Sequence, residues 1–152
     1  MKHYQIAAII PFYDENGQNS TRIIYTDGST ECITCSVRKF MRSIFYDFHS
    51  DPKTVRQWTF EKIGYKLNTP MVINEHLIFI PVKFRKGVGK QDGCYGYLGY
   101  NYIRSVQDQG VYLSTGDFLP NLSAVAYVSR KQQAASILRL CYLEFKRQTE
   151  YM

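Results

Sequence analysis

The chain has 152 residues, of which 45% are apolar and 15% aromatic. This length suits one domain with a single core and argues against two independent domains. Nineteen Lys and Arg against thirteen Asp and Glu give a formal net charge of +6, which favours an anionic partner but carries no information about the fold.

The N-terminal apolar run is short. It extends from Ile6 to Ile10 and is interrupted by Pro11, so it lacks the length of a signal-peptide core. No other stretch approaches the ~18 consecutive apolar residues of a membrane span. We therefore expect a cytoplasmic protein with no membrane partner, whose four cysteines are reduced.

The sequence RIIYTDGSTECITCS, residues 22–36, predicts a first hairpin with its turn at Asp27-Gly28, because glycine adopts the positive φ of tight turns. Cys32 falls inside the second strand, so its C-x-x-C spacing with Cys35 does not open a helix as a redox motif would. A structural zinc site would need further Cys or His ligands at close spacing. We expect all four cysteines to be buried, with no bound metal or cofactor.

A helix is predicted directly after this hairpin. Ser36 is a suitable N-cap, and the apolar residues that follow recur with the period of one helix face. They are Val37, Phe40, Met41, Ile44, Phe45 and Phe48. The opposite face carries the cations Arg38, Lys39 and Arg42.

A central hairpin is predicted in TPMVINEHLIFIPVKF, residues 69–84, with its turn at Asn74-Glu75. The continuous apolar run Leu77 to Ile80 indicates a buried central strand. No helix is predicted in the stretch before it, where Trp58, Phe60 and Ile63 nearly alternate.

A glycine-rich loop and a returning strand follow the central hairpin. The predicted strand runs from Cys94 to Ile103, where tyrosines and smaller residues alternate. The loop that precedes it, from Lys83 to Gly93, is basic. Its cations are Lys83, Arg85, Lys86 and Lys90.

A second hairpin followed by a helix completes the chain. GVYLSTGDFLPNLS, residues 110–123, predicts a turn at Thr115-Gly116, and Ser123 or Ser129 caps a long C-terminal helix. The apolar stripe of that helix is Ala124, Tyr127, Val128, Ala135, Leu138, Tyr142 and Phe145. Together these elements predict an α+β fold: one β-rich domain over residues 1–152, with two hairpin-helix units, a central hairpin and a long C-terminal helix.

Enzyme motifs do not match the sequence. The glycines at 87, 89 and 93 fit neither a P-loop, which needs Ser or Thr after GK and then a helix, nor the G-x-G-x-x-G spacing. His3, His49 and His76 are far apart, and no spacing brings two carboxylates together for acid-base chemistry. We expect no catalysis; an enzyme acting on a phosphorylated small molecule at the glycine-rich loop is the weakest alternative.

Nucleic-acid binding uses more of these residues at once. Glycines let a cationic loop approach a phosphate backbone or enter a groove, and the exposed cations of the first helix can steer phosphates. The predicted DNA-binding residues are Lys83, Arg85, Lys86 and Lys90 of the loop, with Arg85 entering the groove, and Arg38, Lys39 and Arg42 of the helix. The alternative is an RNA or single-strand binding module, in which Tyr97, Tyr100 and Tyr102 stack on unpaired bases.

Two segments of the chain resemble the competence transcription factor family (ComK). In that family Lys-Pro-Pro-Ile leads to a short hairpin, an apolar run ending in Phe-Pro, a variable polar loop, a Cys-Trp or similar pair and a returning strand. The matching positions here are Pro70, Met71 and Val72, then Phe79, Ile80 and Pro81, then Cys94 and Tyr95. The family's later hairpin, Leu-Pro, Ser and helix are similar to VYLSTGDFLPNLS, with Leu119, Pro120 and Ser123 in place.

The resemblance extends in order from about Ile23 to Phe145 and implies a transcription activator of DNA-uptake genes at the bacterial nucleoid. It implies binding to AT-rich boxes of double-stranded DNA through the minor groove, where narrow A·T tracts attract Arg and Lys. It also implies a homo-oligomer, dimer or tetramer, and a proteolytic adaptor that recognises a C-terminal tail in longer members. The family's Gly-Ser-Ser-Tyr-x-Gly-Arg patch is replaced by RSIFYDFHSDPKTVRQ, in which Arg56 stands for its Arg.

Overall fold

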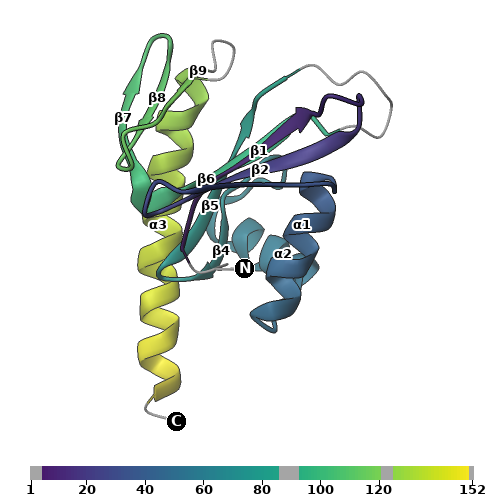
Figure 1. Ribbon diagram of the computed structural model, residues 1–152. Coiled ribbons are helices and arrows are strands. Elements are labelled where there is room, and N and C mark those ends of the chain that lie inside the picture. The colour runs from purple at the N-terminus through teal and green to yellow at the C-terminus, as the bar shows by residue number, and fades with distance from the viewer. Residues whose placement is uncertain (1–4, 86–92, 121–124, 151–152) are drawn as a thin grey trace.

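The computed structural model describes residues 5–85, 93–120 and 125–150, and its main feature is a six-stranded antiparallel sheet (Figure 1). The strand order is β3-β2-β1-β6-β5-β4. The strands are β1 (Ile6–Tyr13), β2 (Asn19–Tyr25), β3 (Thr30–Ile33), β4 (Met71–Asn74), β5 (Leu77–Lys83) and β6 (Tyr95–Gly99). A smaller sheet contains β7 (Ile103–Gln107), β8 (Gly110–Leu113) and β9 (Phe118–Pro120).

Helices cover both faces of the large sheet. The helices are α1 (Val37–Asp47), α2 (Pro52–Ile63) and α3 (Val125–Glu150). In Figure 1, α1 and α2 lie on one side of the sheet, whereas α3 and the small sheet lie on the other, and the C-terminal half of α3 extends past the sheet. The fold is therefore α+β, as the sequence predicts.

The two faces of the sheet belong to two hydrophobic cores. Side chains alternate along a strand, so neighbouring residues of β1 and β2 point to opposite faces. Ile9 and Ile23 pack with Phe40 and Ile44 of α1. Their neighbours Ala8 and Ile24 belong to the core that includes Leu138 of α3. The buried strand predicted at Leu77 to Ile80 is confirmed, since β5 is buried along its length up to Val82.

Both predicted hairpin-helix units are confirmed in outline. Gly28 and Gly116 have φ of 87° and 95°, as tight turns require. The Ser36 hydroxyl accepts a hydrogen bond from the Lys39 N–H at 3.1 Å and caps α1, as predicted. In the second unit Ser129 lies inside α3 and does not cap it, while Ser123 lies outside the described residues.

The helix α2 was not predicted, although its ends carry complete signals. The Asp51 carboxylate accepts a hydrogen bond from the Thr54 N–H at 3.0 Å, Pro52 occupies the first turn, and Gly64 ends the helix with φ 84°. The near-alternation of Trp58 and Phe60 conceals these signals. The helix lies near both β4 and α3, and Trp58 and Phe60 on either side of the buried Thr59 are both half-buried.

Two strands also differ from the sequence-based expectation. β1 was not predicted because Pro11 interrupts its apolar run. In the structure β1 pairs with β6 only at Ala8 and Ile9, so at Pro11 it has a neighbouring strand on one side only. A proline, which lacks an N–H, is tolerated at such a position. The strand predicted from Cys94 to Ile103 was too long. It ends at Gly99, and a 3-10 turn over Tyr100–Tyr102 carries the chain out of the large sheet into β7.

No helix among the described residues is long and apolar enough to span a membrane.

Replacing Gly96 with Ala tests the contact between β1 and β6. An added Cβ would lie 2.2 Å from the backbone oxygen of Ile9, so the strands must separate, and we expect a loss of about 1–3 kcal/mol in the free energy of unfolding. Gly93→Ala is the matched control, because its Cβ would meet nothing within 4 Å. Denaturant unfolding measures both variants; equal stability would contradict the close approach of the strands.

Candidate nucleic-acid interface

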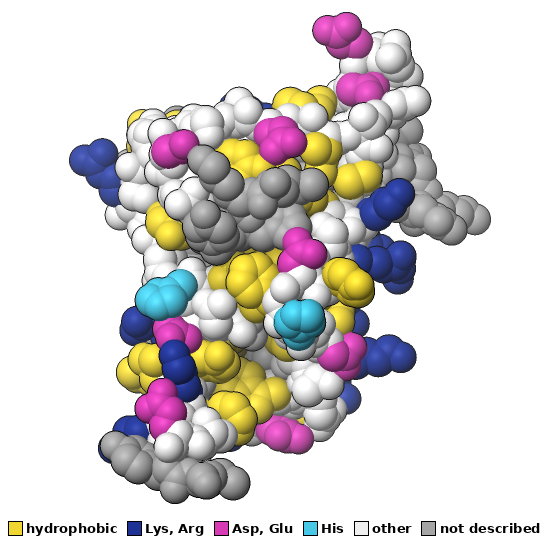
Figure 2. All heavy atoms as spheres, turned by 60° about the horizontal axis from the view of Figure 1, so that its bottom comes forward, with side chains coloured by type: hydrophobic (Ala, Val, Ile, Leu, Met, Phe, Trp, Pro, Cys, Tyr) yellow, Lys and Arg dark blue, Asp and Glu magenta, His cyan; other side chains and the backbone are white. Residues whose placement is uncertain are grey.

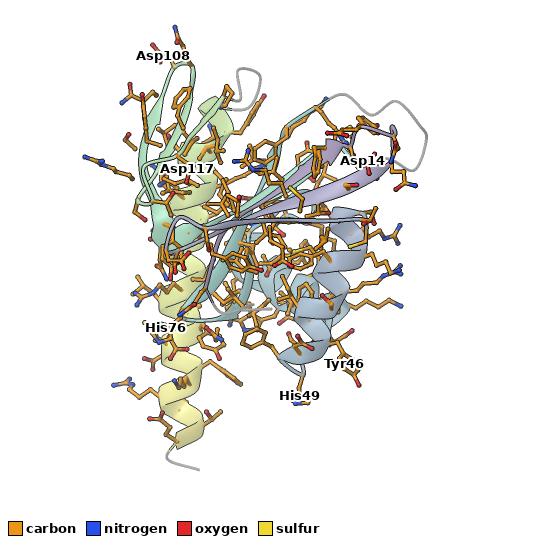
Figure 3. All side chains as sticks on the ribbon, in the orientation of Figure 1. Asp14, Tyr46, His49, His76, Asp108 and Asp117 are labelled. Atoms are coloured by element: carbon orange, nitrogen blue, oxygen red, sulfur yellow. The ribbon has the colours of Figure 1, made fainter. Side chains whose placement is uncertain are left out.

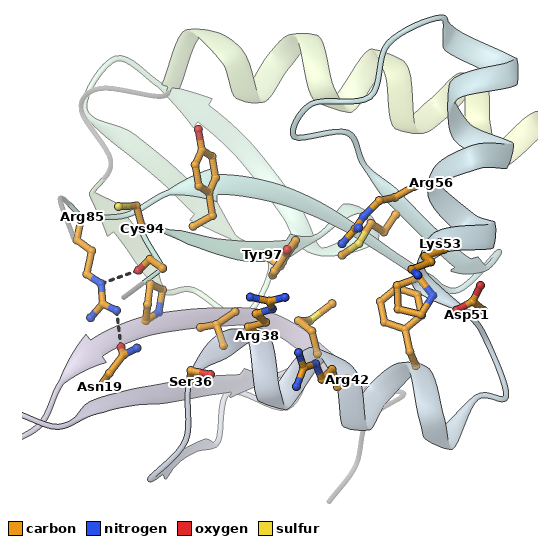
Figure 4. Close-up of a pocket in the computed structure, with 18 residues that line it drawn as sticks. Asn19, Ser36, Arg38, Arg42, Asp51, Lys53, Arg56, Arg85, Cys94 and Tyr97 are labelled. Carbon is orange, nitrogen blue, oxygen red and sulfur yellow. Dashed lines mark hydrogen bonds between the residues drawn. The ribbon is translucent and has the colours of Figure 1, made fainter. Parts of the chain in front are cut away.

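A groove of about 980 Å³ lies between α1, the first turns of α2 and the large sheet. Figure 4 shows side chains from all three walls pointing into it, with Tyr97 of β6 between the helices and the sheet. Its floor is apolar and aromatic. The apolar and aromatic residues that line it are Pro11, Val37, Met41, Phe45, Pro52, Met71, Tyr95 and Tyr97.

Among the described residues, five cations line this groove. Arg38 and Arg42 lie four residues apart and so share one side of α1, while Lys53 and Arg56 share one side of α2 by their spacing of three. Arg85 follows β5 and contributes the fifth positive charge at one end. On the side of the molecule where α1 lies, Figure 2 shows Lys and Arg side chains gathered along the edge.

One acidic side chain, Asp51, lines the groove among the described residues, and it is engaged in capping α2. Its carboxylate accepts hydrogen bonds from the Thr54 hydroxyl at 2.7 Å and from the Thr54 N–H at 3.0 Å. These hydrogen bonds hold the pKa of Asp51 below its ordinary value, and the bond from the Thr54 hydroxyl has the larger effect. The N-terminal ends of both helices reach the groove through Ser36 and Asp51, and their dipoles add positive potential.

Tyr97 keeps a neutral hydroxyl in the floor of the groove. Burial raises the pKa of Tyr97, and the positive charge of Arg56 opposes that shift only in part. The ring is held edge-on against Phe79 with a centroid distance of 6.3 Å. The groove therefore combines long cationic side chains on its walls with an uncharged aromatic floor that packing holds in place.

The structure brings three of the predicted DNA-binding residues, Arg38, Arg42 and Arg85, to one groove. Lys39 is exposed on α1 and Lys83 is half-buried at the end of β5, and neither lines the groove. Lys86 and Lys90 lie outside the described residues.

Arg85 is held against its own chain. Its Nε donates to the Gly93 carbonyl oxygen at 2.9 Å, and its Nη2 donates to the Asn19 side-chain oxygen. The guanidinium also lies over the Tyr13 ring, 4.2 Å from the centroid. These contacts join the two ends of the β5–β6 connection to β2, and Arg85 also lines the groove; that Arg85 enters a DNA groove stays a prediction.

The tyrosines of the proposed stacking platform are not on one surface. Tyr97 packs against the core under α1, whereas Tyr100 and Tyr102 pack against the core under α3. The Tyr100 hydroxyl is hydrogen-bonded to the Ser136 hydroxyl of α3. The three tyrosines therefore do not share one surface; Tyr97 and Tyr100 would point to opposite faces even in a continuous strand, because they are three residues apart.

Two residues of the groove, Lys53 and Arg56, were not among the predicted DNA-binding positions. Their signal was available in the sequence, since Asp51-Pro52 opens a helix and positions 53 and 56 share one of its sides. The resemblance had drawn attention to Arg56 alone.

Potential metal ligands do not cluster in the part of the chain that the structure describes. No group of three or more His, Cys, Asp or Glu side chains that could hold a metal occurs there. His49 lies past the end of α1 and His76 at the β4–β5 turn near α3 (Figure 3). Cys32 is exposed and Cys35, Cys94 and Cys141 are half-buried, so the prediction of four buried thiols is wrong.

Comparison with known proteins assigns no family: no protein-family model, curated protein or solved structure matches the chain.

Replacing Arg85 with Ala should lower the free energy of unfolding by about 1–3 kcal/mol, because two hydrogen bonds and a cation–π contact are lost. Lys83→Ala removes the same charge two residues earlier without these contacts and should cost less. Arg85→Lys should not restore stability, since an ammonium cannot form the same fork. Equal losses for Arg85→Ala and Lys83→Ala in denaturant unfolding would contradict the role of Arg85 in fixing the loop ends.

Proposed function

We propose that this protein is a non-enzymatic regulator of transcription that binds double-stranded DNA with its cationic groove. The observation that carries the proposal is the groove itself, where five cations meet one acidic side chain that is engaged in a helix cap. A sugar-phosphate backbone is the polyanion that such a row of separate positive charges fits, because each neutralised phosphate releases condensed counterions.

The arrangement of the cations supports a backbone contact. Arg38 and Arg42 approach from α1 and Lys53 and Arg56 from α2, so one ridge of phosphates lying along the opening meets positive charge from both walls (Figure 4). Contacts of this kind set the position and affinity of a protein on DNA, whereas base contacts set its sequence preference.

The preference for AT-rich boxes and for the minor groove is part of the proposal and is supported by the resemblance to the competence activators. The same holds for a place at the bacterial nucleoid, for a homo-oligomer and for a proteolytic adaptor as partner. In this proposal residues of the β5–β6 connection enter the minor groove of the DNA. The cationic groove of the protein binds the sugar-phosphate backbone.

The single-strand alternative receives less support from the described residues. Successive unpaired bases need a row of accessible aromatic faces, but Tyr97 belongs to one core and Tyr100 and Tyr102 to the other. A duplex needs no such row.

Charge-removing substitutions at the two walls test the backbone contact. For Arg38→Ala and Arg56→Ala, we expect the slope of log K against log salt for a duplex to become shallower by about 0.9 each, if each residue neutralises one phosphate. Arg104→Ala is the matched control, because Arg104 is exposed on β7, outside the groove, and carries the same charge. Fluorescence anisotropy between 50 and 200 mM salt, conditions of the kind in which such contacts dominate, measures the slopes; three equal slopes would remove the groove from the interface.

Competition among nucleic acids tests the type of partner. We expect an AT-rich duplex to displace a labelled AT-rich duplex at lower concentration than a GC-rich duplex or a single strand does, because narrow A·T minor grooves concentrate negative potential. If the single strand is the strongest competitor at moderate salt, the duplex proposal is wrong. If AT-rich and GC-rich duplexes compete equally, the groove binds backbone without the proposed preference.

A further inference from the structure

A second hollow opens from the cationic groove. It has a volume of about 420 Å³ and shares four lining residues with the groove, namely Arg56, Met71, Tyr95 and Tyr97. Its remaining lining residues are Lys66, Leu67, Asn68, Thr69 and Pro81. The two hollows therefore adjoin one another along these residues; we call the second one the side pocket and the two together the depression.

The side pocket differs from the groove in its chemistry. Two tyrosines, a methionine and a proline contribute aromatic and apolar surface, while Arg56, Lys66, Asn68 and Thr69 contribute polar and charged atoms. Leu67, which also lines this pocket, is 80% exposed, so a ligand seated here would cover it. The volume of the side pocket is within the range of small-molecule sites.

The walls of the side pocket are fixed in position. The Asn68 side-chain nitrogen donates to the Tyr95 hydroxyl oxygen at 3.0 Å, and Asn68 has a positive φ of 52°. The Lys131 ammonium lies 5.6 Å from the centroid of the Tyr95 ring and donates to the Pro81 carbonyl oxygen at 2.6 Å. The loop before β4 thus holds the hydroxyl of Tyr95, and α3 contacts its ring. A ligand therefore meets a preformed surface.

Arg56 lies at the junction of the two hollows, since it lines both. On one side of it are the aromatic walls, and on the other the further cations of the groove, Arg38, Arg42 and Lys53. The depression therefore presents, in order, an aromatic-lined compartment, an arginine and a cluster of cations. No carboxylate lines the side pocket among the described residues, so its potential also favours an anion.

We propose that the adjoining hollows bind a nucleoside phosphate as a small-molecule ligand, with the base in the side pocket against Tyr95 and the phosphates on Arg56 and the groove cations. In a nucleoside phosphate a planar base is joined to an anionic tail, as the aromatic-lined side pocket is joined through Arg56 to the groove cations. Stacking on an aromatic ring tolerates any base, whereas the phosphates supply charge pairing with arginine. Because these cations are the ones assigned to the DNA backbone, ligand and DNA exclude one another; this last point rests on the proposed function.

Calorimetric titration of the whole chain with ADP, pyrophosphate and adenosine, at one ionic strength, separates the two parts of the site. We expect ADP to bind about five- to a hundredfold more tightly than pyrophosphate, the gain from stacking one base, and adenosine to bind weakest. Equal affinity for ADP and pyrophosphate would overturn the base pocket. Absence of binding by both would overturn the site.

Variants assign the contacts. Tyr95→Leu should reduce ADP affinity to that of pyrophosphate and leave pyrophosphate unchanged, whereas Arg56→Gln should weaken both. Leu67→Ser tests the side pocket without disturbing the core, because this side chain is largely exposed, and should weaken ADP a few-fold but not pyrophosphate. Arg104→Gln, on β7, is the control for net charge and should change neither. ADP affinity that is unaltered by both Tyr95→Leu and Leu67→Ser would overturn the assignment of the base.

A competition experiment distinguishes this inference from the proposed function. ADP should release a labelled duplex from the protein at concentrations near its own dissociation constant. If the protein binds no DNA but binds ADP with the stated variant pattern, the proposed function fails and the nucleotide site stands. If DNA binds and ADP at saturation leaves it bound, the shared use of the cations is wrong.

Discussion

The pairing of β1 with β6 is the constraint on which the rest of the structure depends. It joins β3-β2-β1, from the first part of the chain, to β6-β5-β4, from the second, through only two residue pairs, Ala8 with Leu98 and Ile9 with Tyr97. The strands approach closely because Gly96 faces the backbone of β1, where a Cβ would lie 2.2 Å from an oxygen atom. A short seam with a glycine next to it therefore makes one sheet from two halves.

This seam also places the two cores and the groove. Since adjacent residues of β6 point to opposite faces, Leu98 enters the core under α3 while Tyr97 enters the floor of the groove under α1. One wall of the groove comes from α1, which follows β3, and the other from α2, which precedes β4. Neither half of the chain forms the groove alone, so its binding properties depend on the correct register at β1 and β6.

Gathering cations in one groove has an energetic consequence for the unbound protein. Like charges on facing walls repel one another, and among the described lining residues only Asp51, already bonded to Thr54, offsets them. Any bound polyanion or nucleotide relieves this repulsion and so stabilises the folded state by mass action. Arg85 shares this cost, because the partners of its hydrogen bonds are neutral groups, whereas Tyr97 adds no charge and burial raises its pKa further.

The sequence by itself determined the local structure: turns at Gly28 and Gly116, the cap at Ser36, the apolar face of α1 and the buried run of β5, all of which depend on neighbouring residues. It also contained the signals of α2, which the alternation of Trp58 and Phe60 concealed. The tertiary structure decided the rest, because charge attraction and packing act between residues far apart in the chain. Only the folded sheet shows that Lys53 and Arg56 face Arg38, that Arg85 is bonded to Asn19, and that Tyr97 and Tyr100 belong to different cores.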